Sequence, residues 1–465
     1  MSHHPGREVK PITLASGNPA EAPGCSGNVV IHTHGCKLNQ ADSSNLARRF
    51  RQAGYRVVED VSEADIYVLN TCTVTATADS KARQTLRAAR RANPHAIVVA
   101  AGCYPQRAAE ELAQMPAVNL VVGNEEKDDL AALAIEAHRD RSGTTAELFR
   151  DSSSWPYDED AAGNLPGRTR AMVKIQEGCD QVCAYCIVPR VRGRERSIPP
   201  GQIIRQVRRS VEEGCQEAVL TGTQLGTYGF DLPGADLNQL IRRILEETDI
   251  RRLRVSSLQP QEIDEELLHI WTNHRRLCPH FHVPLQSGSD TILKAMRRRY
   301  TTSQFAETVQ LIRSMVPDAG ITTDVIVGFP GEGDKEFQDS LAFASEMAFS
   351  DLHAFPYSRR PGTSAVYLEG HVADQVKRER MRQIMQTART SFQEFRANLL
   401  GSTRPVLWEG RAGKDSNPRG LTDNYVRVEM EPSKDEMWSS DLSNKITPSL
   451  LIEMNGDLVT ARPLH

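Results

Sequence analysis

Short apolar runs alternate with amphipathic stretches along most of this 465-residue chain. Between residues 28 and 140, four β-branched runs are separated by segments with the apolar spacing of helices. Such alternation is typical of βαβ units, in which parallel strands form one sheet covered by helices. We therefore predict an α/β fold that begins with a Rossmann-like parallel-sheet domain over residues 28–140.

The alternation resumes at about residue 165, after a polar stretch rich in Gly, Pro, Ser and Asp that we interpret as a linker over 141–164. Six more strand candidates follow, in RAMVKIQ, EAVLTGT, RLRVSSL, HFHVPLQ, TTDVIVGF and DLHAFPYS. Six repeats are too many for a small sheet, so we predict a partial (β/α)6 barrel over 165–395. Its site is expected at the C-terminal ends of the strands.

The two ends of the chain differ from this pattern. Residues 399–465 contain short alternating runs with Gly, Pro and Asn turns, which predict a small all-β barrel. Residues 1–27 have no apolar core, so we interpret them as a disordered leader and not as a signal peptide. No apolar stretch approaches the ~20 residues of a membrane helix. We expect a cytoplasmic protein without a membrane partner.

Three of the nine cysteines stand at equivalent places in the N-terminal repeats. Cys36, Cys72 and Cys103 each occupy the last position of a strand-like run. Parallel strands bring their carboxyl ends to one edge, where ligands bind. The alternative is three small buried side chains, since free cysteine is often a core residue. The repeated position favours a shared metal site.

A second set, Cys179, Cys183 and Cys186, forms a C-x3-C-x2-C run after the first strand of the predicted barrel. Closed zinc and iron–sulfur sites normally use four protein ligands. Either a fourth ligand comes from elsewhere, or one metal position is open. Thiolates favour iron–sulfur clusters or zinc, and zinc ribbons use two separated pairs. Tyr185 places an aromatic ring beside this loop.

The motif at this position resembles that of the radical S-adenosylmethionine (SAM) superfamily, whose cofactor chelates the open iron. HGCKLNQADS, NTCTVTATADSKARQ, AAGCYPQ, HVPLQSGSDTILKAMRRRYT, TDVIVGFPGE and FPYSRRPGT resemble segments of the methylthiotransferases, and the tail resembles their TRAM domain. The resemblance covers residues 28–463. NTCTVT, KIQEGC, HAFPYSRRPGTSA and TDNYVRV are most similar to the branch that acts on N6-threonylcarbamoyladenosine-37 of tRNA.

The resemblance implies two 4Fe–4S clusters and S-adenosyl-L-methionine as cofactors. Cys179, Cys183 and Cys186 would hold the radical-generating cluster. Cys36, Cys72 and Cys103 would hold an auxiliary cluster that carries the sulfur of the methylthio group. The implied partners are the tRNA anticodon loop with adenosine-37, an electron donor and a sulfur source, neither of which the sequence identifies. The default expectation for the oligomeric state is a monomer.

Further residues are candidates for contact with cofactor or RNA. The set expected near S-adenosylmethionine is Tyr185, Gly222, Gln286, Ser287 and Asp324. Each is also explained by an ordinary turn or strand end. The set expected to bind RNA phosphates shares one helix face and consists of Arg83, Arg87, Arg90 and Arg91. A solvated basic face is the alternative, as it is for the run from Arg297 to Arg299.

The tail gives little electrostatic support for RNA binding, because residues 402–465 hold ten acidic and eight basic side chains. A basic side remains conceivable through Arg404, Arg411, Lys414, Arg419 and Arg427. Trp408 and Tyr425 are candidates either for base stacking or for barrel core. His34 is expected at a solvent-facing turn. Three cysteines match no cluster position and are expected to be bystanders, namely Cys25, Cys215 and Cys278.

Two other interpretations remain open. The first is the same chemistry on isopentenyladenosine-37 of tRNA or on an aspartate of a ribosomal protein. Only the resemblance to one branch of the family separates these substrates from threonylcarbamoyladenosine. A non-catalytic iron–sulfur or zinc protein that binds RNA is a different class, and two separate three-thiol sets argue against it. Iron with matching sulfide supports the enzyme, whereas zinc supports the structural role.

Overall fold

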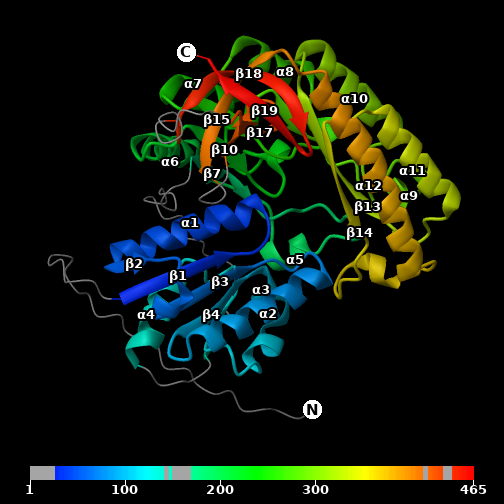
Figure 1. Cartoon of the computed structure of the whole chain (residues 1–465). Helices are drawn as coiled ribbons and strands as arrows, with labels where there is room; N and C mark the ends of the chain where they lie inside the picture. Colours follow the sequence, from blue (N-terminus) through cyan, green and yellow to red (C-terminus); the bar gives the residue numbers. More distant parts are fainter. Residues whose placement is uncertain (1–26, 141–145, 149–168, 412–416, 433–441, 465) are drawn as a thin grey trace.

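The computed structural model describes residues 27–140, 146–148, 169–411, 417–432 and 442–464 (Figure 1). Cys25 and most of the predicted leader and linker lie outside these ranges. Within them the chain forms an N-terminal parallel sheet, a central open barrel and a C-terminal closed barrel. The predicted fold class is therefore confirmed. In the described part of the chain, no helix is both long enough and apolar enough to cross a bilayer.

The N-terminal domain is a six-stranded parallel sheet in the order β2-β1-β3-β4-β5-β6. Its strands are β1 (Gly27–Thr33), β2 (Tyr55–Val57), β3 (Ile66–Thr71), β4 (Ile97–Gly102), β5 (Leu120–Val122) and β6 (Ala146–Leu148). Its helices are α1 (Lys37–Gln52), α2 (Ala76–Ala92), α3 (Cys103–Ala113) and α4 (Leu130–Asp140), with a 3-10 turn η1 (Val61–Glu63). The last strand was not expected, because residues 146–148 fall in the predicted linker.

The two faces of this sheet are both covered, as the all-apolar strands require. Val68 and Val99 point to one face, which packs against α1 and α4, whereas Leu69 and Ala100 point to the face covered by α2 and α3. The sheet therefore leaves only its edges free to meet the rest of the chain.

The central domain contains six parallel strands in two groups, β7-β10-β11 and β12-β13-β14. Parallel bridges from Leu253 to Leu277 and from Ser257 to His282 join the groups, so the order follows the sequence from β7 to β14. The described residues show no pairing between β7 and β14, and the barrel is therefore open on that side. The strands are β7 (Arg170–Lys174), β10 (Glu217–Thr221), β11 (Arg252–Val255), β12 (His280–His282), β13 (Gly320–Val327) and β14 (Asp351–Pro356).

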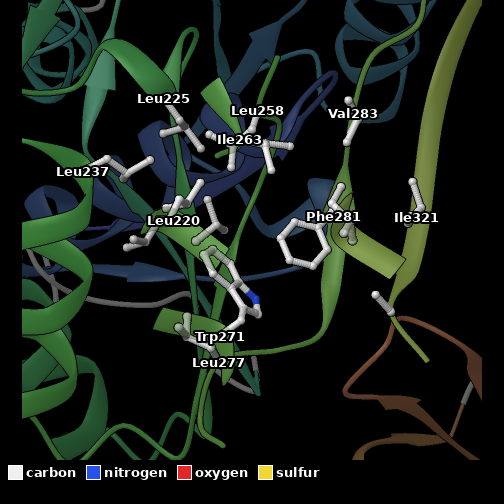
Figure 2. Packing of buried hydrophobic residues seen from close by; sticks show 14 of the residues in the cluster. Leu220, Leu225, Leu237, Leu258, Ile263, Trp271, Leu277, Phe281, Val283 and Ile321 are labelled. Carbon is white, nitrogen blue, oxygen red and sulfur yellow. The ribbon is translucent and has the colours of Figure 1, made fainter. Parts of the chain in front are cut away.

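Helices cover the outside of the open barrel. They are α6 (Pro200–Glu212), α7 (Leu237–Glu247), α8 (Glu265–Asn273), α9 (Asp290–Ala295), α10 (Thr302–Met315), α11 (Asp334–Glu346) and α12 (Asp374–Ala397). The short helix α5 (Val188–Arg192) instead packs against α3 of the N-terminal domain. Shorter elements are β8 (Gln176–Glu177), β9 (Arg196–Ser197), η2 (Leu225–Thr227), η3 (Pro260–Glu262) and η4 (Ser364–Tyr367). Figure 2 shows Phe281, Val283 and Ile321 packed with Leu220 and Trp271 in the core beneath these helices.

The C-terminal domain is a closed five-stranded barrel in the order β15-β16-β17-β19-β18. Its strands are β15 (Thr403–Arg411), β16 (Pro418–Thr422), β17 (Arg427–Met430), β18 (Ile446–Asn455) and β19 (Leu458–Pro463). Trp408 is fully buried in its core and donates a hydrogen bond from Nε1 to Thr447 Oγ1 at 2.8 Å. The stacking role considered for Trp408 is therefore excluded.

The turn between β16 and β17 fastens this small barrel to the central one. Arg252 donates to the carbonyl oxygens of Leu421 and Thr422 at 3.1 and 2.9 Å, and Arg254 donates to that of Asp423 at 2.9 Å. Glu217 is fully buried and balances both arginines, at 2.7 Å from Arg252 and 2.8 Å from Arg254. One buried carboxylate therefore balances both arginines of this contact.

Acid is expected to weaken this junction. Although burial opposes ionisation, Arg254 and Arg252 lower the pKa of Glu217 to about 2. A depressed carboxyl pKa contributes stability that is complete above the unfolded value of about 4.3 and lost as the pH falls toward 2. We expect Glu217→Gln to flatten the pH dependence of the urea midpoint in that window. An unchanged slope would show that other carboxyl groups govern acid unfolding.

Candidate active site

Cys179, Cys183 and Cys186 lie in the loop that follows β7 and β8, at the C-terminal end of the open barrel. The Gln181 N–H donates to Cys179 Sγ at 3.4 Å, and the amide of Cys186 donates to the Cys183 carbonyl at 3.1 Å. Burial raises the pKa of Cys179 to about 11 and that of Cys186 to about 12. The neutral thiols are thus favoured until a metal displaces their protons.

The other three cysteines meet at the carboxyl edge of the N-terminal sheet, as the sequence predicts. Cys36 is the N-cap of α1, Cys72 directly follows β3, and Cys103 opens α3 after β4. A Cβ on Gly35 would lie 2.7 Å from Cys72 Cβ, so this turn needs glycine at φ +115°. Burial, with smaller contributions from Cys103 and Cys36, raises the pKa of Cys72 to about 12.

Arg192 is a charged residue beside this set that the sequence analysis missed. It is buried at the end of α5 and donates to Asn39 Oδ1, while its charge acts on Cys103 and Cys36. It belongs to a buried ion network between the two domains that also contains Asp42, Lys127, Lys174 and Glu177. Through this network the charge of Arg192 is held beside the thiols.

One cavity of about 590 Å³ reaches both domains that carry the cysteine sets. Cys36 lies in its wall together with Cys179, Cys183 and Cys186. The size falls in the range typical of sites for small molecules and cofactors. Cys36 of the N-terminal set and all three cysteines of the barrel loop therefore open onto the same space, whereas Cys72 and Cys103 are buried behind Cys36 and not in this wall.

Four of the five residues expected to bind the cofactor also line this cavity, namely Tyr185, Gly222, Gln286 and Asp324. Gln286 has a left-handed backbone, with φ at +67°. Ser287 does not join them. Its hydroxyl lies 3.2 Å from Ser340 Oγ and accepts the N–H of Ser289 at 3.3 Å, which is a packing role.

Gly222 is tightly enclosed. A Cβ there would lie 2.9 Å from Leu225 Cδ2 and 3.0 Å from Gln176 Oε1, the oxygen that accepts the amides of Thr223 and Gln224. Gly222→Val would push this loop into the cavity, because a packed site cannot absorb the added atoms without movement.

We expect Gly222→Val to weaken S-adenosylmethionine binding about tenfold or more, which corresponds to roughly 1.4 kcal/mol. Isothermal titration of the cluster-loaded protein measures this change. Gly201→Ala is the matched control, because its Cβ would meet only Arg205 Nη1 at 3.7 Å. Equal affinities for both variants would remove Gly222 from the cofactor site.

Arg298 is a cavity residue that the sequence grouped with a surface basic run. Its Nη1 donates to Cys183 Sγ at 3.4 Å, its Nη2 to Gln259 Oε1 at 3.1 Å and its Nε to Tyr300 Oη at 3.1 Å. Its guanidinium is therefore fixed beside Cys183 and next to Tyr185. Burial raises the pKa of Tyr185 well above its usual value. The sequence showed only that Arg298 belongs to a run of three consecutive arginines.

The predicted RNA-binding face of α2 is divided in the structure. Arg83 donates to Tyr104 Oη and forms an ion pair of 2.8 Å with Glu111, and Arg90 donates to the carbonyls of Pro94 and Ala96. These two arginines stabilise the domain itself. Arg87 and Arg91 are exposed, so RNA contact stays a prediction for them.

The candidates in the C-terminal barrel separate in the same way. Arg404 is ion-paired with Asp423 at 2.9 Å, and Arg419 lies 3.8 Å from Glu429. Arg427 is exposed, whereas the side chain of Arg411 and all of Lys414 lie outside the described residues. The charges of Arg404 and Arg419 are thus partly neutralised by acids within the barrel.

The other residues singled out in the sequence lie at the cavity, at the edge of the N-terminal sheet or in the protein interior. Tyr425 leaves the small barrel and lines the cavity, stacked on His280 with ring centres 4.1 Å apart. His34 is partly buried, and its N–H donates to the Asn70 carbonyl at 2.8 Å. Cys215 and Cys278 are buried away from both cysteine sets.

Comparisons with known proteins agree with this arrangement. Residues 28–123 match the uncharacterized protein family UPF0004, and residues 173–344 match the radical SAM superfamily. The chain is 39% identical to threonylcarbamoyladenosine tRNA methylthiotransferase MtaB of Aquifex aeolicus, over 88% of this chain and 97% of that protein. It is 35% identical to the Bacillus subtilis protein of the same name, over 88% and 91%.

A tRNA-2-methylthio-N(6)-dimethylallyladenosine synthase of Syntrophus aciditrophicus is 33% identical, over 86% of this chain and 88% of that protein. The open barrel with its three-cysteine loop defines the broad class, that of the radical SAM enzymes. The chain belongs to the methylthiotransferase family within this class.

The donor sets fit the cofactors of this family, which are two 4Fe–4S clusters and S-adenosylmethionine. Each set supplies three thiols, and three thiolates leave one iron of a four-iron cluster without a protein ligand. The cavity gives a small molecule access to the barrel set and to Cys36 of the N-terminal set. Soft sulfur ligands and the nearby cations Arg192 and Arg298 suit an anionic iron–sulfur cluster.

Proposed function

We propose that this enzyme methylthiolates C2 of N6-threonylcarbamoyladenosine-37 in tRNA, in the cytoplasm, and so forms 2-methylthio-N6-threonylcarbamoyladenosine. The observation that supports it best is the single cavity shared by Cys36 and by Cys179, Cys183 and Cys186. When bound, the two clusters supply the electron that cleaves S-adenosylmethionine to a radical and the sulfur that is transferred. The relatives named MtaB support threonylcarbamoyladenosine as the substrate.

The protein's own residues position the reactants. C2 of adenine carries a strong, non-acidic C–H bond, so a side-chain base at neutral pH does not remove its hydrogen. The buried ion networks fix the N-terminal sheet against the open side of the barrel, and thereby hold Cys36 opposite the loop of Cys179. Proximity of this kind accounts for much of the acceleration in such reactions. Tyr185, Gly222 and Arg298 would surround the cofactor side of the cavity.

The same reaction on dimethylallyladenosine is the second candidate, because the Syntrophus relative is only slightly less similar. The reconstituted enzyme should be given anticodon stem-loops with either modified adenosine, together with dithionite, sulfide and S-adenosylmethionine. Mass spectrometry of the digested RNA is expected to show a gain of the methylthio group only on threonylcarbamoyladenosine. A product only on dimethylallyladenosine would overturn the substrate assignment.

A further inference from the structure

Beyond the cysteines, the cavity wall contains a group of charged, histidine and tyrosine side chains, of which only Asp324 was expected near the cofactor. They come from three domains and are Lys37, His280, His282, Asp324, His353 and Tyr425. Phe281 and Val283 point outward into the helix-covered core (Figure 2), so the alternation along the chain turns His280 and His282 inward.

Asp324 holds two of these histidines. His282 Nε2 lies 3.2 Å from Asp324 Oδ2, and His353 Nδ1 lies 3.5 Å from Asp324 Oδ1. The strand register explains the contact, since Asp324 on β13 is the direct neighbour of His353 on β14. The hydrogen bond to Asp324, with smaller contributions from Asp351, raises the pKa of His353. Its ring is 50% exposed, which leaves Nε2 available to a ligand.

Lys37 brings a second cation to the same place. It follows Cys36 directly and is mostly buried, with Nζ 5.7 Å from the centre of the Tyr425 ring. Its charge acts on both His280 and His353. Among the described residues, no carboxylate lies within ion-pair distance of Lys37. The phenol of Tyr425 acts on its charge, and so does Glu217, a carboxylate that Arg252 and Arg254 already engage.

A mostly buried cation without a carboxylate partner is costly, and an anion from a ligand would offset that cost. The one carboxylate in the described lining of the cavity, Asp324, already contacts the two histidines His282 and His353. The substrate class proposed above offers a matching group. A threonylcarbamoyl substituent on N6 ends in a carboxylate, whereas a dimethylallyl substituent is apolar.

The position of the pocket fits the shape of the nucleoside. N6 and C2 both leave the purine on its Watson–Crick side. An adenosine with C2 facing the cysteine sets would thus direct its N6 substituent within the same cavity. Because Cys36 and Lys37 are consecutive, the sulfur-carrying site and the unpaired cation are necessarily close together.

We propose that Lys37 and His353 form a subsite for the carboxylate of the threonylcarbamoyl group, and that Asp324 orients His353 for this contact. The subsite would select substrates with a carboxylate on the N6 substituent over those with an apolar one. This inference rests on the proposed function, since it assigns the residues that recognise its substrate.

Binding in the absence of S-adenosylmethionine tests the subsite without turnover. Labelled anticodon stem-loops would carry threonylcarbamoyladenosine, its methyl ester or unmodified adenosine at position 37, and anisotropy would give the dissociation constants. We expect the cluster-loaded wild type to bind the free acid about tenfold more tightly than the ester or adenosine, as one charge-assisted contact allows. His353→Gln should remove this preference and leave the affinity for unmodified adenosine unchanged.

Lys37→Gln should act in the same way, with iron content measured because Cys36 is its neighbour. His269→Gln and Lys335→Gln are matched controls on exposed helix positions and should retain the preference. Equal wild-type affinity for acid and ester would overturn the subsite, as would a His353→Gln variant that keeps the preference. A stoichiometric divalent metal that is lost in His353→Gln would also overturn it, since His282, Asp324 and His353 would then be metal ligands.

The subsite and the proposed function fail in different ways. If acid and ester bind equally while threonylcarbamoyladenosine is still methylthiolated, only the subsite is wrong. If the enzyme modifies dimethylallyladenosine alone, the proposed function is wrong, and the subsite falls with it.

Discussion

Replacing Cys179, Cys183 and Cys186 together by alanine is expected to lower the iron content from about eight to about four atoms per chain and to abolish methylthiolation completely. Cleavage of S-adenosylmethionine to 5′-deoxyadenosine should cease as well, because these three thiols line the cavity together with Tyr185, Gly222 and Arg298. Iron and sulfide analysis, with chromatography of 5′-deoxyadenosine, measures both effects.

The corresponding variant of Cys36, Cys72 and Cys103 should lose the same amount of iron but behave differently. It should still release 5′-deoxyadenosine, and it should form no methylthio product. Cys215→Ala is the matched control, because this cysteine is buried in the barrel core, and it should keep all iron. Full iron content in either triple variant, or zinc in place of iron, would refute the assignment of two clusters.

Removal of the Asp79 carboxylate is expected to cost about 3–5 kcal/mol in the free energy of unfolding, because it leaves the buried Arg360 without its carboxylate partner. Asp79 lies on α2 and pairs with Arg107 at 2.9 Å and with Arg360, from the loop after β14, at 2.6 Å. Thr73 donates to the same carboxylate at 2.6 Å, one residue from Cys72. Asp79→Ala thus breaks a contact between the N-terminal domain and the barrel.

Urea unfolding of Asp79→Ala and of Asp339→Ala compares this buried pair with a surface one. Asp339 pairs only with exposed Lys335 on the same helix, so its loss should cost about 0.5 kcal/mol or less. A change below 1 kcal/mol for Asp79→Ala would mean that the two domains do not depend on this ion pair. The chain would then need another contact to hold the cysteine sets opposite each other.

The sequence predicted the parts of the site that follow from local patterns. Cys36, Cys72 and Cys103 follow the neighbouring parallel strands β1, β3 and β4, and such strands end at one edge, so their convergence was predictable. The six strands of the open barrel were predictable because each is a short apolar run between helical stretches. The tight enclosure of Gly222, in contrast, depends on Gln176 from the preceding strand segment, which no local pattern reveals.

Contacts between domains were the part that the sequence did not reveal. Asp79 was visible only as the one acid on a basic helix, and its partner Arg360 lies 281 positions away. Tyr425 reaches the cavity from a turn, where its φ is +74°, and stacks on His280 of the central domain. One overlooked signal was local: the alternation in HFHV places His280 and His282 on the face opposite to Phe281 and Val283.

The central claim is that this enzyme makes 2-methylthio-N6-threonylcarbamoyladenosine, and nucleoside mass spectrometry of host tRNA tests it most directly. Total tRNA from cells with and without the gene should be digested and compared. The account predicts that the methylthiolated nucleoside disappears and that N6-threonylcarbamoyladenosine accumulates when the gene is absent. Persistence of that nucleoside, with loss of the methylthiolated dimethylallyl form, would contradict the substrate assignment and leave only the chemistry of the family.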